Sequence, residues 1–105
     1  MMLTRLVAVA LFILPATAFA QEQGDAKQGR AFSERVCAEC HAVGPEGGMS
    51  PNLSAKSFKK IASRRETTVI SLAAWMQSEH ENMPHLMLKP EDLNDVITYI
   101  MSLKE

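Results

Sequence analysis

Two cysteines and one histidine form the cluster in this sequence whose spacing is best suited to chemistry. Cys37 and Cys40 are separated by two residues and His41 follows directly, which gives the order C-x-x-C-H. This order is a signal for covalent haem attachment. Thiols three residues apart can each form a thioether to one of two neighbouring porphyrin vinyl groups, and the adjacent imidazole can then reach the iron. We therefore expect Cys37 and Cys40 to attach one haem c and His41 to be the proximal iron ligand.

Three other uses of the cysteine pair fit the sequence less well. A thioredoxin-like redox pair belongs in a βαβ context, but no long segment alternates apolar and polar residues as a strand does. A structural zinc site needs four ligands, and His80 and His85 are poor substitutes for a second Cys/His pair. A disulfide that closes so short a loop removes little entropy from the unfolded chain. Haem attachment is the favoured interpretation.

A haem iron bound by His41 has a second axial position, for which Met83 is our candidate. The chain has seven methionines, and most such residues are core filler. Met83 precedes Pro84 in an irregular stretch, where the proline stops a helix and stiffens the loop. Met87 is the main competitor, and His80 or His85 would give a bis-histidine iron instead. A methionine opposite a histidine raises the potential and closes the iron to added ligands, which suits electron transfer.

The first 20 residues have the order of a secretory signal peptide. Arg5 precedes an uninterrupted apolar run, and Pro15 and the triplet Ala18-Phe19-Ala20 follow it. The run spans about nine residues, whereas a membrane-spanning helix needs roughly 20. We therefore expect cleavage after Ala20 rather than retention as an anchor, with residues 21–105 as the mature periplasmic domain and no stable membrane span after cleavage.

Length and charge narrow the class of protein further. The chain has 105 residues and a formal net charge of −1, so one domain is expected and a basic nucleic-acid-binding face is not. A mature domain this short buries little apolar surface and usually needs a disulfide, a metal or another staple. A covalently held haem would supply the missing core.

Helical periodicity and capping residues predict an all-α fold. Asp25 begins a predicted helix that ends near Val36, and a short helix is predicted over 57–64. Thr67 or Thr68 is a candidate N-cap for a helix that reaches about Ser78. The last helix has Pro90 at its first position and Glu91 and Asp92 in its first turn. The apolar stripes predicted to be buried in the last two helices are Val69, Leu72, Ala73 and Met76, and Leu93, Val96, Ile97, Ile100 and Met101.

Taken together, these residues resemble the small bacterial class I cytochromes c over nearly all of 24–104. The segments that carry the resemblance are Gly24 to Phe32, Cys37 to Val43, Ser50-Pro51-Asn52-Leu53, His80-Glu81-Asn82-Met83-Pro84 and Glu91 to Ile100. The resemblance implies three main helices, with short helices and loops, wrapped around one covalently attached haem. It also implies a mono-haem electron carrier and not an enzyme.

The resemblance assigns further roles to individual residues. It implies that the Pro51 carbonyl accepts a hydrogen bond from the ring N–H of His41, which would fix and tune the ligand. Leu53 would pack on the proximal haem face. Gly29 and Tyr99 match the close crossing of the first and last helices, while Phe32 stands one position earlier than in the mitochondrial pattern. Asn82 would lie near the Met83 sulfur.

The expected function is that of a monomeric carrier that moves single electrons between redox proteins, such as an oxidase, a reductase or a periplasmic dehydrogenase. The alternatives are an open iron site that binds a small ligand, and a subunit held tightly by one dehydrogenase. A docking patch for an acidic partner is one interpretation of a dense basic stretch, and a solvated helix face is the other. This basic stretch comprises Lys56, Lys59, Lys60, Arg64 and Arg65.

Overall fold

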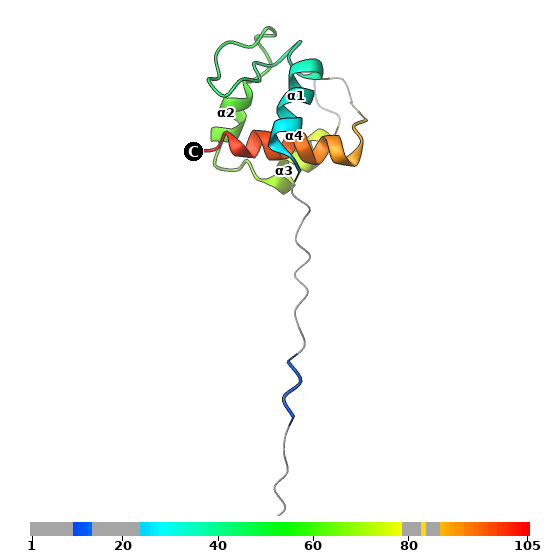
Figure 1. Ribbon diagram of the computed structural model, residues 1–105. Coiled ribbons are helices and arrows are strands. Elements are labelled where there is room, and N and C mark those ends of the chain that lie inside the picture. The colour runs from blue at the N-terminus through cyan, green and yellow to red at the C-terminus, as the bar shows by residue number, and fades with distance from the viewer. Residues whose placement is uncertain (1–9, 14–23, 79–82, 84–86) are drawn as a thin grey trace, which may run out of the picture.

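The described part of the chain forms four α-helices, shown in Figure 1. The computed structural model describes residues 10–13, 24–78, 83 and 87–105. The helices are α1 (Ala26–Val36), α2 (Phe58–Ser63), α3 (Val69–Met76) and α4 (Pro90–Ser102). No β-strand occurs in the described ranges. The predicted all-α class is confirmed. None of the described helices is both long and apolar enough to cross a membrane.

Helix α1 begins and ends where its sequence predicts. The Asp25 carboxylate is the N-cap and accepts hydrogen bonds from the amides of Lys27 and Gln28, at 2.9 and 3.1 Å. The helix ends at Val36, and the Cys37 amide closes the last turn by donating to the Ser33 carbonyl. Because α1 ends at Val36, the cysteine pair lies directly after the C-terminal end of the helix.

Helix α4 supplies most of the core. Pro90 occupies its first turn, and the predicted acidic residues Glu91 and Asp92 are in the first turn as well. Lys89, the N-cap residue, makes no side-chain cap bond. The buried side chains of α4 come from one face of the helix. They pack on Phe58 and Ala62 of α2 and on Leu72 of α3. These α4 residues are Val96, Ile97, Tyr99 and Ile100.

The first and last helices cross at very short range (Figure 1). A Cβ atom added to Gly29 would overlap the backbone carbonyl of Asp95 and lie 3.0 Å from Cβ of Tyr99. Because only glycine leaves enough space there, the expected pairing of Gly29 with Tyr99 is confirmed. The segment before α1 is fastened to α4 too, since the Asp25 amide donates to the Asp95 carboxylate at 2.7 Å.

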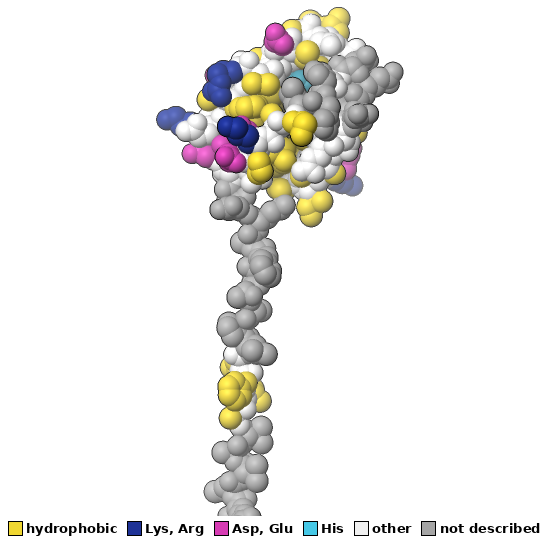
Figure 2. Space-filling model, turned by 90° about the vertical axis from the view of Figure 1, so that its right-hand side faces the viewer, with side chains coloured by type: hydrophobic (Ala, Val, Ile, Leu, Met, Phe, Trp, Pro, Cys, Tyr) yellow, Lys and Arg dark blue, Asp and Glu magenta, His cyan; other side chains and the backbone are white. Residues whose placement is uncertain are grey.

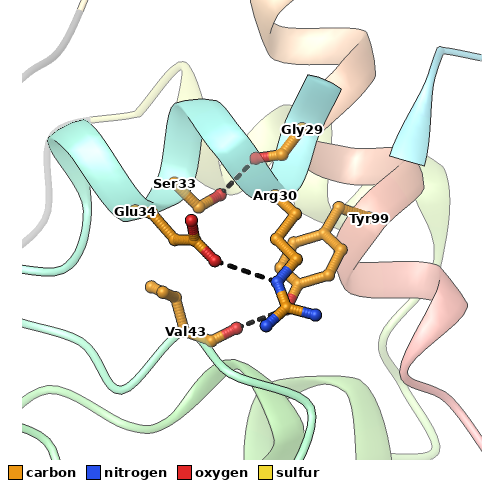
Figure 3. Close-up of polar contacts among 6 residues, drawn as sticks. All are labelled: Gly29, Arg30, Ser33, Glu34, Val43 and Tyr99. Atoms are coloured by element: carbon orange, nitrogen blue, oxygen red, sulfur yellow. Dashed lines mark hydrogen bonds and ion pairs between the residues drawn. The ribbon is translucent and has the colours of Figure 1, made fainter. Parts of the chain in front are cut away.

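Ser33 occupies the position one residue after Phe32 in the helix crossing. Its side chain is fully buried, and its hydroxyl donates to the Gly29 carbonyl at 2.7 Å (Figure 3). Phe32 is half-buried against the edge of the core. The fully buried position therefore holds a small hydroxyl, while the aromatic ring of Phe32 packs at the edge of the core.

Helix α3 departs in part from its predicted pattern. Thr68 is its N-cap, as one of the two predicted residues, and forms a reciprocal capping box with Ser71. Leu72 is buried and Met76 is half-buried against the core, but Val69 is 37% exposed. The prediction that Val69 is buried is therefore wrong, because the helical stripe extends beyond the surface that the other helices cover.

Candidate functional site

The two cysteines and the histidine lie in one tight turn after α1. The amides of Cys40 and His41 both donate to the Cys37 carbonyl, at 3.2 and 3.0 Å. Cys37 is buried, whereas Cys40 and His41 are half-buried. Both cysteines are free thiols, so no disulfide joins them. The turn brings two thiols and one imidazole together, as attachment to a single flat group requires.

The environment of Cys37 does not favour thiolate chemistry. Burial raises the pKa of its thiol above the ordinary value, against a smaller opposing effect from a hydrogen bond with Ser33. Catalytic and redox-active cysteines instead have a lowered pKa in an exposed, electropositive setting. This environment argues against a thioredoxin-like use of the pair.

The imidazole of His41 is held from two sides. Its ring lies 5.4 Å from the ring of Phe58, centroid to centroid, at an interplanar angle of 51°. Its Nδ1 atom lies 2.6 Å from the backbone carbonyl oxygen of Lys56. A carbonyl can only accept, so this contact places the ring proton on Nδ1 and leaves the Nε2 lone pair to bind a metal.

The acceptor at Nδ1 differs from the one that the resemblance implies. The expected partner was the carbonyl of Pro51, whereas the structure places the carbonyl of Lys56 there. The reason lies in the path of the loop after His41. The Phe58 amide donates to the Ala42 carbonyl at 2.9 Å, which returns the chain to the motif just after Lys56.

Two further bonds tie the same loop to the motif. The Asn52 amide donates to the Cys40 carbonyl at 3.1 Å, and the Ala42 amide donates to the Ser50 hydroxyl at 3.0 Å. Gly47 and Gly48 make the preceding turn with φ of +75° and +94°, a backbone conformation that favours glycine. The residues on either side of His41 are thus fixed by loop 42–58.

The methionines differ in exposure. Met83 is half-buried, while Met87 is 90% exposed and Met49 is 83% exposed. Met76 and Met101 pack against the core, which confirms their expected role as filler. His80, His85 and Asn82 lie outside the described residues.

Several large apolar side chains of the loop after the motif and of α3 stand exposed. Figure 2 shows apolar side chains gathered beside the histidine on one face of the molecule. The exposed fractions are 81% for Leu53, 60% for Trp75 and 72% for Ile70. Pro51 is exposed as well. Two thiols and an imidazole in one turn, next to a loop with exposed Pro51 and Leu53, fit a haem, which is a large apolar disc with a metal at its centre.

A protein-only metal site is not supported by the described ranges. They contain no group of three or more His, Cys, Asp and Glu residues that could hold an ion. The zinc interpretation therefore finds no ligand set in that part of the chain.

The basic stretch covers the start of α2 and the turn after it. Lys56, Lys60, Arg64 and Arg65 are exposed. Lys59 forms an ion pair with Glu105 at 2.7 Å, which lowers the pKa of the Glu105 carboxyl. The stretch thus presents exposed positive charge, with Lys59 neutralised in part.

Comparison with known proteins decides the family. The cytochrome c family matches residues 26–104, from the first residue of α1 to the penultimate residue of the chain. The chain belongs to the cytochrome c family. It is 31% identical over 80 residues to cytochrome c-552 of Bradyrhizobium diazoefficiens, with 76% of each chain covered. It is 28% identical over 81 residues to a cytochrome c-553-like protein of Synechocystis, covering 77% of this chain and 71% of that one. No solved structure matches significantly.

Membership in this family establishes the main class of chemistry. The protein is a mono-haem electron carrier and not an enzyme, and it exchanges electrons with redox partners. The C-x-x-C spacing of Cys37 and Cys40 is consistent with covalent haem c.

The sequence did not predict two groups that hold His41 and its neighbours in place. The Lys56 carbonyl and the Ser50 hydroxyl both act on or beside His41. No side-chain pattern marks a backbone carbonyl, so only the loop path identifies the first. The second has no local signal either, because the Ser50 hydroxyl accepts from the Ala42 amide, eight residues earlier in the chain.

Proposed function

We propose that this protein is an exported periplasmic carrier whose haem iron is bound by His41 and Met83. The observation that supports it best is the His41 ring, with Nδ1 at 2.6 Å from a carbonyl and Nε2 available to a metal. Cys37 and Cys40 would form the two thioethers. When bound, the haem supplies an iron that alternates between ferric and ferrous states.

The protein side chains have distinct tasks in this proposal. His41 donates the Nε2 lone pair and keeps its proton on Nδ1. Met83 would hold the iron through its thioether and exclude added ligands, and thioether ligation would favour the ferrous state. Leu53 and Pro51, both exposed in the loop that is bonded to the motif, would pack against the haem and cover it from water. Electron transfer then needs no proton transfer and no open iron site.

The assignment of Met83 is tested with a matched pair of variants. Iron–methionine ligation in the oxidised protein gives a weak charge-transfer band at the edge of the near infrared. We expect Met83→Ala to lose this band and Met87→Ala, at an exposed position four residues away, to keep it. Persistence of the band in Met83→Ala would assign the ligand to another methionine. Its absence from the wild type would favour His80 or His85.

The closed iron site is tested with carbon monoxide. We expect the reduced wild-type protein to bind it slowly, because Met83 must first leave the iron, and Met83→Ala to bind it rapidly. Rapid binding by the wild type would instead favour a protein with an open site.

Export and docking complete the proposal. We expect N-terminal sequencing of the periplasmic protein to begin at Gln21, and an intact Met1 would contradict cleavage. The exposed basic stretch would meet an acidic redox partner, so electron transfer should slow as salt rises. Charge reversal by Lys60→Glu and Arg64→Glu should reduce that salt dependence, whereas Lys27→Glu in the exposed part of α1 should not.

A further inference from the structure

We propose that the Glu105 carboxylate occupies Lys59 in the place of a partner's carboxylate, and so weakens the docking of acidic proteins on the basic stretch. The inference rests on the proposed function in one respect, namely that an acidic redox partner docks on this stretch. It adds a competing contact within the chain, because a partner reaches Lys59 only by displacing Glu105.

The two charged groups are in direct contact. The Lys59 ammonium nitrogen lies 2.7 Å from a Glu105 carboxylate oxygen, at the distance of a charge-assisted hydrogen bond. The hydrogen bond and the charge of Lys59 hold the pKa of the Glu105 carboxyl below its ordinary value. Both partners are therefore charged near neutral pH, and Glu105 offers Lys59 the same group that an acidic protein would offer.

The surroundings of Lys59 set it apart from the rest of the basic stretch. Its side chain is 33% exposed, whereas the neighbouring Lys60 belongs to the exposed residues. A Cβ atom added to Gly47 would lie 3.2 Å from Cβ and 3.4 Å from Cγ of Lys59, so the lysine side chain passes close to the turn of loop 42–58. The Lys59 side chain is thus confined between Gly47 and Glu105, and a partner meets Lys60 more readily.

The segment before Glu105 is fastened to the protein by contacts that do not involve the ion pair. Leu103 is buried in the core. The Lys104 ammonium donates to the carbonyls of Arg64 and Thr67, at 3.0 and 2.7 Å. The backbone that carries Glu105 is therefore held beside the turn after α2 whether or not the ion pair is formed. A carboxylate tethered in this way competes at a high effective concentration and avoids the entropy cost of association.

The charge of the basic stretch determines what the contact does to a partner. Residues 56–65 contain five cations and no acid, and pairing of Lys59 leaves four exposed cations. Because an exposed ion pair is weak, a densely acidic partner can displace Glu105, whereas a sparsely acidic one gains too little from Lys59 to do so. The pair therefore selects for partners with many carboxylates.

The contact is tested by the binding of a short poly-glutamate peptide to the haem-loaded protein at low ionic strength. Glu105→Gln removes the carboxylate charge and keeps the shape of the side chain. We expect it to tighten peptide binding by about two- to fourfold, the range of an exposed ion pair. Glu91→Gln, at an exposed position in the first turn of α4, makes the same change in net charge and is the control. Equal tightening in both variants would overturn the proposal, because net charge alone would explain it.

A second set of variants assigns the effect to Lys59. Lys59→Gln should weaken peptide binding less than Lys60→Gln does, because Glu105 already holds Lys59. In the Glu105→Gln background, Lys59→Gln should remove the whole gain in affinity. A gain that survives the loss of Lys59 would show that Glu105 acts elsewhere and would overturn the proposal.

Failure of this inference differs from failure of the proposed docking surface. If Lys60→Gln and Arg64→Gln leave peptide binding unchanged, the basic stretch does not bind acidic chains and both proposals fall. If these two variants weaken binding while Glu105→Gln acts only as Glu91→Gln does, the docking surface stands and the competing contact falls. The ion pair is also measured without a peptide, by carbon NMR: the pKa of the Glu105 carboxyl should rise in Lys59→Gln, and an unchanged pKa would contradict the pair.

Discussion

The crossing of α1 and α4 and the face around the C-x-x-C-H motif are built in opposite ways. At the crossing, Gly29, Ser33 and Tyr99 are buried and every polar group named there is bonded within the protein. In loop 42–58, which is bonded to the motif, Leu53 remains 81% exposed and Pro51 is exposed as well. The protein's own atoms complete the first region, while the second carries apolar surface suited to a large flat cofactor. The crossing therefore provides the scaffold and the motif face provides the site.

The largest expected effect comes from removing both attachment points. Cys37→Ala with Cys40→Ala should abolish covalent haem entirely, since no other cysteine exists in the chain. A domain this small then loses much of its core, and its cooperative unfolding transition with it. Haem staining after denaturing electrophoresis and thermal unfolding provide the measurements.

The same variant tests the difference between the two regions. Hydrogen exchange should accelerate most in loop 42–58 and α3, and less at the α1–α4 crossing. Met49→Ala, at a position that is 83% exposed, is the matched control and should keep its haem. Equal loss of protection in both regions would contradict the division into scaffold and site.

Gly29→Ala should disrupt the crossing itself. The new Cβ atom would overlap the Asp95 backbone, which cannot move without shifting α4. We expect a loss of about 2–3 kcal/mol in the free energy of unfolding, even though alanine favours helix. Urea denaturation of the haem-loaded protein measures it, with Gln28→Ala at the exposed neighbouring position as the control. A neutral effect would mean that the helices can separate freely.

Tyr99→Phe should have a smaller effect, at the contact where the scaffold meets the site. The Tyr99 hydroxyl donates to the Val43 carbonyl at 2.6 Å, two residues after His41 (Figure 3). Removing it leaves a buried carbonyl without this donor and should cost about 1–2 kcal/mol. Chemical denaturation near neutral pH measures the difference between the two proteins.

The difference in free energy of unfolding between wild type and Tyr99→Phe should depend on pH, because the Tyr99 phenol can ionise. Burial raises the pKa of Tyr99 above its ordinary value of 10.0. The folded state therefore favours the protonated phenol, whose contribution is complete below pH 10.0 and is lost as pH rises through the folded-state pKa. The stability gap between wild type and Tyr99→Phe should narrow in alkaline solution. A gap that widens there would contradict the buried, protonated assignment.

The scaffold was predictable from the sequence because its signals are local. Asp25 caps α1 and Pro90 opens α4, as their residue types predict. The pattern failed at Val69, where periodicity marks an apolar face without saying how far the neighbouring helices extend. Burial at a helix end depends on tertiary packing, which no periodicity contains.

In the site, the sequence predicts the side chains that carry the chemistry but not the backbone groups that hold them. Cys37, Cys40 and His41 are identified by spacing, and the structure gathers them in one turn. The backbone carbonyl that contacts His41 could not be predicted by spacing, because every residue has a backbone carbonyl. Which carbonyl arrives depends on the path of loop 42–58 and on the bond between Phe58 and Ala42.

The smallest expected effect concerns a contact that joins the segment after α4 to the turn after α2. The Lys104 ammonium donates to the carbonyls of Arg64 and Thr67, at 3.0 and 2.7 Å. Lys104→Ala should reduce the free energy of unfolding by about 0.5–1 kcal/mol, since the bonds are charged but solvent competes for them. Lys27→Ala is the control for the loss of one exposed lysine. Because the contact lies in the scaffold, the reduction potential should stay unchanged. A shifted potential would mean that the turn after α2 and the loop that carries Lys56 move together, so that scaffold and site are not separable there.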